Sequence, residues 1–327
     1  MKRIYVGIDI SKETLDLCIK RENTFSFKNI KNRVKAIEKL LKTLKKEGKE
    51  VFIAMENTGH YNFNLYDVLE HFNFKVFVID PKHLKRSIGL TRGKNDKVDA
   101  KRIAVFIERN YQDFQTWTPT SESMKTMKVL FTERDYIKRQ RASLKQKTTA
   151  LKHISFNKST EKLIKMHKKG IDRMSQEIKE IEAMIRKEVN ADEHLKKEIQ
   201  RLKTIPGVGD VMAWTFAIKT EGFTRLTNPR KLGCYAGVVP FEQQSGTSLK
   251  TKPRVSKMSD TQMKTTLQMA AMRAVRMKND LQHYYERKVK EGKNKMSVLN
   301  AVRNKIIHIA MALIRNQTFY QNRLELS

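Results

Sequence analysis

Short apolar runs alternate with amphipathic segments over roughly the first third of the chain. Strand patterns lie at residues 2–8, 15–20, 24–28, 51–55 and 75–79, and helix patterns lie at 32–44, at 61–72 and from 97 onward. Pro81 follows the last of these strands. Strands that alternate with helices predict an α/β domain, in which a mixed or parallel sheet is covered by helices.

The pattern changes at Pro119, because the next 80 or so residues lack proline and contain only Gly170 as a helix breaker. This predicts two long helices. The second has an a/d seam, with apolar residues at 171, 174, 178, 181 and 185. The first has leucine or isoleucine every seven residues, but Arg134 and Arg141 occupy other seam positions, which makes its face half basic.

Two interpretations of these helices stay open. One is a solvated helical hairpin, and the other is a coiled coil that dimerises and also grips a phosphate backbone. Residues 120–170 contain 14 Lys/Arg and 4 Asp/Glu, which favours the second interpretation. Under that interpretation, Arg134 and Arg141 are nucleic-acid-binding residues.

A third region begins near Leu195 and is predicted to be helical, apart from a polar loop between Pro240 and Ser259. The expected domains are therefore 1–118, 119–196 and 197–327. The fold class is α/β plus α: an α/β domain, a basic coiled-coil region and a mainly helical C-terminal domain.

Composition narrows the function. Lys+Arg number 67 against 35 Asp+Glu, so the formal net charge is +32, and a charge this large requires a polyanionic partner. No segment is expected to reach the roughly 18 apolar residues of a membrane span, and the N-terminal apolar run is too short for a signal peptide. Cys18 and Cys234 form no disulfide or zinc pattern. These features predict a cytoplasmic, nucleic-acid-binding protein without a membrane partner.

Four carboxylates follow elements that can bring them together. Asp9 ends the first strand, Glu56 ends a later strand, and Asp96 and Asp99 lie on one side of a helix start. Such a cluster is unfavourable unless cations neutralise it, and hard oxygen ligands suit Mg²⁺ or Mn²⁺. Two such ions can hold the attacking and leaving oxygens of a phosphodiester.

Each acid also has a structural interpretation. Asp96 is an ordinary N-cap, Asp99 a first-turn acid, and Glu56 a turn residue. Asp9 is the hardest to explain in this way, because a carboxylate directly after a buried strand is costly. The ordered set favours a function over four separate coincidences.

Two further motifs lie in the third region. In Ile205–Gly209 (IPGVG), Gly207 and Gly209 are typical of a helix-hairpin-helix, whose backbone approaches phosphate without reading sequence; a plain helix connector is the alternative. Ser245 lies beside Gly246 in the polar loop. A serine there could attack a phosphodiester, although Ser-Gly is more commonly a flexible turn. The loop precedes four cations, which are expected to bind nucleic acid: Lys250, Lys252, Arg254 and Lys257.

Five ordered motifs together resemble the DEDD-type insertion-sequence transposases related to the Piv DNA invertases, which are family one-ten of the insertion sequences and are also called bridge recombinases. The resemblance covers essentially the whole chain. It rests on these segments: GIDISK, ENTGHY, DKVDAKRIA, IPGVG and KLGCYAGVVPFEQQSG.

The resemblance implies a RuvC/RNase H-like N-terminal domain, a coiled coil and a C-terminal transposase domain. It implies that the four acids bind metal and that Ser245 is the nucleophile of a phosphoserine intermediate. Where family members often read Ser-Ser-Gly-Gly, this chain has Gln244 before Ser245 and Thr247 after Gly246, so Gln244 cannot act and Ser248 is a weaker rival.

The family's partners are implied in the same way. They are double-stranded DNA, a structured non-coding guide RNA and further copies of the chain in a homodimer or homotetramer, in which the acidic site of one subunit is completed by the transposase domain of another. Two alternatives remain: a RuvC-like nuclease that uses water and needs no Ser245, and a non-catalytic nucleic-acid-binding protein that tolerates Asp9→Asn.

Overall fold

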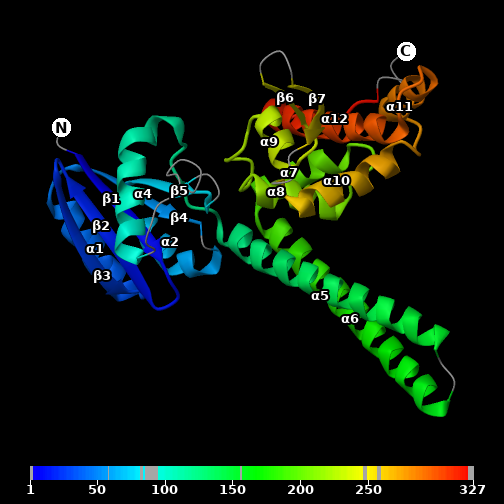
Figure 1. The fold of residues 1–327 in the computed structure, drawn as a ribbon, viewed down its shortest axis with the longest axis horizontal. Coiled ribbons are helices and arrows are strands. Elements are labelled where there is room, and N and C mark those ends of the chain that lie inside the picture. Colours follow the sequence, from blue (N-terminus) through cyan, green and yellow to red (C-terminus); the bar gives the residue numbers. More distant parts are fainter. Residues whose placement is uncertain are drawn as a thin grey trace. The chain divides into compact units, whose positions relative to one another are not determined.

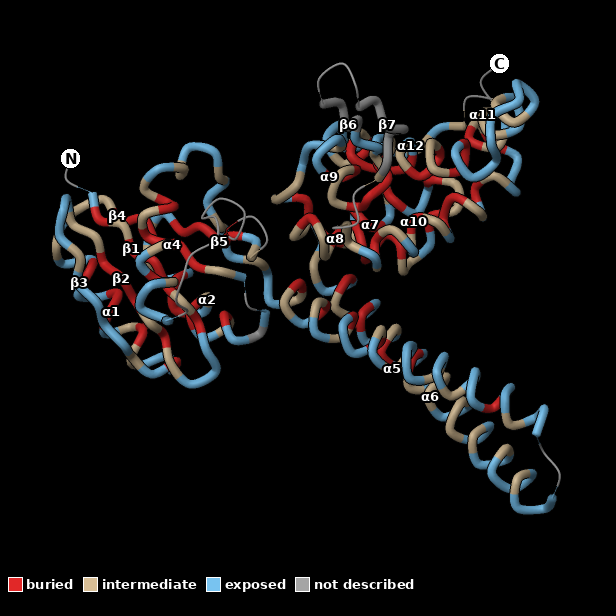
Figure 2. Tube along the Cα trace, in the orientation of Figure 1, coloured by how far each residue is buried: buried red, intermediate tan, exposed pale blue. Residues whose placement is uncertain are grey.

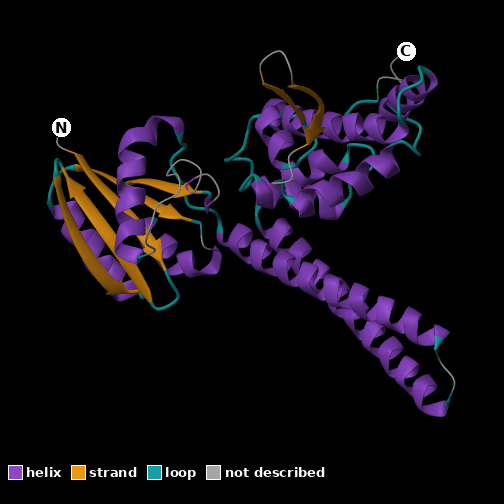
Figure 3. Ribbon diagram, viewed as in Figure 1, coloured by secondary structure: helices purple, strands orange, loops and turns teal. Residues whose placement is uncertain are grey.

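The computed structural model describes residues 3–57, 59–81, 84, 95–154, 157–245, 249–255 and 259–322. The chain forms two compact units, Met1–Pro119 and Thr120–Ser327. The first is an α/β unit and the second is mainly helical (Figure 3). A mixed α/β N-terminal region followed by a helical region is the arrangement that the sequence predicts.

The first unit contains a five-stranded mixed sheet of order β3-β2-β1-β4-β5. Strands β1, β2 and β3 form antiparallel pairs, whereas β4 and β5 run parallel to β1. All five predicted strands are present; β5 has the predicted ends, and the other four differ from the prediction by one to three residues at one or both ends. The bounds are β1 Arg3–Ile10, β2 Thr14–Arg21, β3 Thr24–Lys31, β4 Glu50–Glu56 and β5 Lys75–Ile79.

Helices cover both faces of this sheet (Figure 1). On one face, α1 and α2 pack against the apolar residues of alternate strand positions, such as Val6 and Ile53. On the other face, α4 packs against Phe52 and Phe77. The bounds are α1 Val34–Lys46, 3-10 helix η1 Gly59–Asn62, α2 Phe63–Leu69, α4 Asp96–Asn110 and 3-10 helix η2 Tyr111–Asp113.

Gly7 fixes where α4 crosses the sheet. A Cβ atom on Gly7 would lie 2.1 Å from the carbonyl oxygen of Ala100 and 2.4 Å from the nitrogen of Ala104. Only a residue without a side chain allows this approach of helix backbone to strand backbone. The first turn of α4 therefore lies over the C-terminal end of β1.

The second unit begins with the two long helices that the sequence predicts, α5 Glu122–His153 and α6 Lys158–Ala191, which pack along each other. Ile178, Ile181 and Ile185 of the a/d seam are buried. The half of the hairpin near the helical core buries most of the apolar side chains, whereas its far half is mostly exposed (Figure 2).

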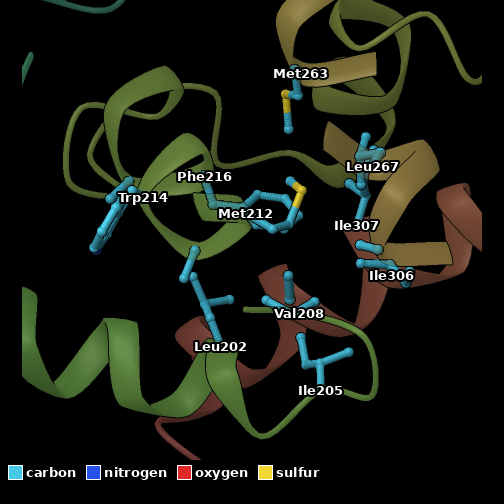
Figure 4. Close-up of a cluster of buried hydrophobic side chains, with 14 of the residues drawn as sticks. Leu202, Ile205, Val208, Met212, Trp214, Phe216, Met263, Leu267, Ile306 and Ile307 are labelled. Carbon is cyan, nitrogen blue, oxygen red and sulfur yellow. The ribbon is translucent and has the colours of Figure 1, made fainter. Parts of the chain in front are cut away.

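The remaining helices form one hydrophobic core that includes Met127 of α5 and Ile185 of α6. Figure 4 shows side chains of the α7–α8 connection, α8, α10 and α12 meeting in this core. The bounds are α7 Glu193–Lys203, α8 Asp210–Lys219, α9 Pro229–Tyr235, α10 Thr261–Ala274, α11 Asp280–Lys290 and α12 Lys295–Asn316.

Two expectations about this unit need correction. The polar loop after Pro240 is an antiparallel hairpin, with β6 at Pro240–Ser245 and β7 at Leu249–Val255. In addition, α12 is the described helix whose length and composition would suit a membrane span, and half of its apolar window is buried. Because Val302, Ile306 and Ile307 lie in the core, packing accounts for its apolar character.

Candidate acidic site and serine hairpin

Asp9 and Glu56 lie side by side at the C-terminal ends of neighbouring parallel strands. The ladder pairs Ile8 of β1 with Met55 of β4, so Asp9 and Glu56 occupy the next position on each strand. Because side chains alternate along a strand, Asp9 shares the face of Gly7, which is the face that α4 covers. Both side chains are half-buried.

The first turn of α4 supplies the other two acids. Asn95 is the N-cap, and its side chain accepts a hydrogen bond from the nitrogen of Lys97 at 3.1 Å. The interpretation of Asp96 as the N-cap is therefore wrong, and its exposed carboxylate is not used as a cap. Asp99 follows one turn later, and Arg102 donates to its Oδ1 at 2.8 Å.

The carboxylates interact electrostatically. The pKa of Asp9 rises from 3.8 to about 6, mainly because the carboxyl is partly buried, and the negative charges of Asp96, Asp99 and Glu56 contribute to the same rise. The charges of the other three predicted acids therefore act on Asp9 at this edge of the sheet. A divalent cation would relieve this repulsion, and carboxylate oxygens are the donors that Mg²⁺ and Mn²⁺ prefer.

Among the described residues, no three potential ligands are gathered closely enough to enclose a metal ion. The carboxylates of the four residues, placed at two adjacent strand ends and on the first turn of α4, have the chemistry of a divalent-cation site.

Three polar residues near this edge escaped prediction. Asp16 pairs with Asp9 across β1 and β2, and its carboxylate accepts from Asn29 Nδ2 at 2.9 Å. Asn62 is fully buried, and its Nδ2 donates to the carbonyl oxygen of Glu56 at 3.0 Å. Asn32, which was expected to open α1, instead precedes the N-cap Arg33 and is buried. No sequence signal marks these contacts, because they depend on how the strands and loops are placed against one another.

Ser245 is the last residue of β6 and pairs through its backbone with Leu249, the first residue of β7. Its side chain is not among those the structure describes, and the same holds for Lys250, Lys252 and Arg254 in β7. Four other residues of this motif lie outside the described residues altogether: Gly246, Thr247, Ser248 and Lys257.

The base of the serine hairpin is fixed to the helical core. Asn300 of α12 donates to the carbonyl oxygen of Val238 at 2.7 Å. Asp260 caps α10, and it also accepts from Lys219 Nζ at 2.8 Å and from Tyr235 OH at 3.0 Å. These contacts hold the pKa of Asp260 below its usual range, although burial opposes them. The hairpin is thus a projection from a rigid support.

The two glycines of the α7–α8 connection differ. Gly207 has φ +81°, and a Cβ there would lie 2.2 Å from the carbonyl oxygen of Ala270, so its role is close packing against α10. This packing accounts for a glycine at position 207, and the predicted phosphate contact of its backbone stays a prediction. Gly209 precedes α8 and faces open space, which leaves the predicted phosphate contact possible there.

Arg134 and Arg141 take part in the interior of the α5–α6 hairpin. Arg134 is 7% exposed, and its Nε donates to Glu182 Oε1 at 2.8 Å. Arg141 donates to Ser175 Oγ at 3.1 Å. Arg134 is therefore buried and ion-paired, and it is not part of the exposed surface that the sequence predicts to bind nucleic acid.

An acidic edge on an α/β unit, in a chain with a strongly basic helical unit, is an arrangement typical of proteins that process phosphodiesters in nucleic acids. Comparison with known proteins identifies the group within that class. A transposase family model matches residues 6–155, and the model of the transposase IS116/IS110/IS902 family matches residues 199–286. The chain belongs to this family of transposases, which confirms the resemblance found in its motifs.

Relatives support the assignment over the full length of the chain. The chain is 24% identical to the pilin gene-inverting proteins of Moraxella bovis and Moraxella lacunata, over 99% of this chain and 99% of each relative. It is also 24% identical to the transposase for insertion sequence element IS1328 of Yersinia enterocolitica, over 64% of this chain and 66% of the relative.

Proposed function

We propose that the chain is a DNA recombinase in which Asp9, Glu56, Asp96 and Asp99 hold Mg²⁺ or Mn²⁺. The observation that carries the proposal is the placement of Asp9 and Glu56 at adjacent strand ends, on the sheet face that is covered by the helix carrying Asp96 and Asp99 in its first turn. The strand order β3-β2-β1-β4-β5 supports a RuvC/RNase H-like domain. When bound, the cation would polarise the scissile phosphate and offset the charge that develops on it.

Ser245 is the nucleophile in this proposal. Its Oγ–phosphorus bond forms as the bond between phosphorus and the 3′ oxygen breaks, the hydroxyl proton leaves Oγ, and the departing 3′ oxygen takes up a proton. The ester preserves the phosphodiester bond energy, so the reverse step on a new 3′-hydroxyl needs no nucleotide cofactor. Its place at the end of β6, on a hairpin fixed to the core, supports this role.

The partners in this proposal are double-stranded DNA, a structured guide RNA and further copies of the chain, in a nucleoid-associated setting. The names of the relatives point to inversion and transposition of DNA. The far part of the α5–α6 hairpin supports a nucleic-acid partner: residues 138–170 contain 11 Lys/Arg and one acid, Glu161. The family resemblance favours RNA as the occupant of this surface.

Covalent trapping tests the chemistry. The full chain is incubated with element-derived RNA, Mg²⁺ and labelled element-end DNA, and a denaturing gel reveals any protein–DNA adduct. Ser245→Ala and Asp9→Asn are run beside it, with Ser248→Ala as the matched serine control. We expect an adduct that is absent from the first two variants and retained in the control.

Other outcomes favour the other functions. Cleavage without an adduct that persists in Ser245→Ala would favour a nuclease that uses water. DNA binding that is unchanged in Asp9→Asn and needs no metal, without any cleavage, would favour an architectural protein. An adduct lost in Ser248→Ala instead would move the nucleophile to that residue.

A further inference from the structure

Asn32 lies between β3 and α1, and it connects segments that are distant in the sequence. It is buried, and its Nδ2 donates to the carbonyl oxygen of Ser11 at 2.9 Å and to that of Tyr61 at 3.0 Å. Its backbone nitrogen donates to the carbonyl oxygen of Glu13 at 2.9 Å. Its own carbonyl oxygen accepts from Asn64 Nδ2 at 2.9 Å.

The two carbonyl oxygens that accept from Asn32 Nδ2 lie in the segments that follow Asp9 and Glu56 in the chain. Ser11 follows Asp9 by two residues, and Tyr61 lies in η1, five residues after Glu56. The backbone pairing between β1 and β4 ends at Ile8 and Met55. Beyond that point, the two loops are connected by the hydrogen bonds of the Asn32 side chain. The Ser11 loop is itself rigid, because Ser11 Oγ and nitrogen both bond to Thr14.

Helix capping does not explain Asn32. The N-cap of α1 is Arg33, which makes no side-chain capping bond. The Oδ1 atom of Asn32 is buried and has no hydrogen-bond partner. An unsatisfied buried acceptor destabilises a fold, so the amide at this position carries a cost to stability. Two Nδ2 bonds that join the loops of Asp9 and Glu56 are the compensating feature.

We infer that Asn32 is a positioning residue for the acidic site: it holds the loop after Asp9 against the loop after Glu56, and thereby sets the separation of the two carboxylates and the affinity for a divalent cation. This inference rests on the proposed function. Removing a residue that orients metal ligands without binding the metal typically lowers metal affinity by about 10- to 100-fold. We expect the loss of the Asn32 side chain to have an effect in that range.

The test measures Mn²⁺ affinity of the full chain by calorimetry, together with stability in urea. Asn32→Asp keeps the shape of the side chain but replaces both donors with an acceptor. Its added negative charge would by itself strengthen cation binding, so weaker binding reports displaced loops. Asn32→Ala is the second variant, in case the buried charge of Asn32→Asp prevents folding. Asn64→Ala is the matched control, because it removes a bond to the backbone of Asn32 without touching Ser11 or Tyr61.

We expect both Asn32 variants to bind Mn²⁺ at least about tenfold more weakly, while Asn64→Ala stays near wild type. Wild-type affinity in the Asn32 variants, or equal weakening in Asn64→Ala, would overturn the inference. Asp9→Asn separates the two proposals: if it also leaves Mn²⁺ binding unchanged, the acidic site itself fails. If it abolishes binding while Asn32→Asp does not, only the positioning role fails.

Discussion

The acidic edge of the first unit and the far part of the α5–α6 hairpin both gather charges of one sign, but with opposite physical consequences. At the acidic edge, neighbouring strands and the first turn of α4 hold four half-buried or exposed carboxylates together. Along residues 138–170, 11 cations are spread over two long helices with Glu161 as the one acid. Repulsion is thus concentrated in the first case and distributed in the second.

The two regions differ in how far their charged groups are exposed to solvent. Burial and three neighbouring charges raise the pKa of Asp9 to about 6, because the sheet prevents the carboxylate from moving into water. The lysines of the hairpin reach solvent, where salt screens their repulsion within about 10 Å. Concentrated charge selects a small divalent ion at one position, whereas distributed charge suits an extended polyanion. Substitutions that alter one region and leave the other unchanged can therefore test this comparison.

The largest effect is expected from Gly7→Ala, which forces α4 away from β1, since the added Cβ would meet Ala100 and Ala104 at 2.1 and 2.4 Å. We expect a loss of about 3 kcal/mol from the first unit and much weaker Mn²⁺ binding, because the acids of α4 move with it. Trp117 and Trp214 are the two tryptophans of the chain, so single-tryptophan variants report each unit separately in urea.

Gly207→Ala is the matched control for Gly7→Ala, because its added Cβ would lie 2.2 Å from the carbonyl oxygen of Ala270 in the second unit. It should destabilise the second unit, which Trp214 reports, and leave Mn²⁺ affinity unchanged. Equal Mn²⁺ affinity in wild type and Gly7→Ala would show that α4 does not position the site.

Arg134→Ala should destabilise the second unit by about 2 kcal/mol, because it leaves Glu182 and Asp135 without their buried cation. The double substitution Arg134→Met with Glu182→Leu, which replaces the ion pair with two apolar side chains, should restore most of this loss. Trp214 fluorescence in urea measures both. A fall in nucleic-acid affinity without any loss of stability would contradict the interior role and return Arg134 to the binding surface.

Asp9→Asn should stabilise the metal-free first unit at pH 8 by roughly 2 kcal/mol, after discounting for the solvent that reaches the carboxylate. The pKa of Asp9 in the folded chain, about 6, exceeds its ordinary 3.8, so the folded state binds the proton more tightly. Its contribution to stability is therefore full below pH 4 and is lost as the pH rises to 6.

The measurement is urea unfolding of wild type and Asp9→Asn with EDTA, followed through Trp117 at pH 4 and pH 8. The difference in stability should be small at pH 4 and clear at pH 8, and saturating Mn²⁺ should reverse it in favour of wild type. A difference that does not vary with pH would mean that Asp9 ionises normally in the folded unit.

Local patterns predicted most elements, because strand alternation and helix periodicity are properties of adjacent residues. Asp9 and Glu56 could be placed at strand ends for the same reason. The β6–β7 hairpin was missed, since Pro240, Pro253 and a run of polar residues hide its alternation. The bond from Asn300 to the carbonyl oxygen of Val238, at the base of the hairpin, joins residues that are distant in the sequence and has no local signal.

Side-chain roles that depend on distant partners were beyond prediction. Asn32 resembles a helix cap in the sequence, but its amide bonds to Tyr61, which lies 29 residues away. Arg134 has the pattern of a basic seam, and only the position of Glu182 on α6 shows that its charge is neutralised. The close packing of Gly207 against Ala270 of α10 likewise joins residues that are distant in the sequence.

The smallest effect is expected from removing exposed positive charges from the far part of the α5–α6 hairpin. The test variant combines three substitutions in α5: Lys145→Gln, Lys147→Gln and Lys152→Gln. A control of equal net charge removes three exposed cations from α1, by Lys35→Gln, Lys39→Gln and Lys46→Gln. Each phosphate contact contributes about 0.9 to the slope of log affinity against log salt, so the hairpin variant should lower that slope by about 2 to 3. Stability should change by less than about 0.5 kcal/mol, because exposed charges are screened.

Fluorescence anisotropy with labelled element-derived RNA and with duplex DNA, each over a range of salt, measures the slopes. Equal slopes in the two triple variants would mean that net charge alone attracts the polyanion, whereas a loss confined to the hairpin variant locates the contact on α5 and shows which nucleic acid it binds.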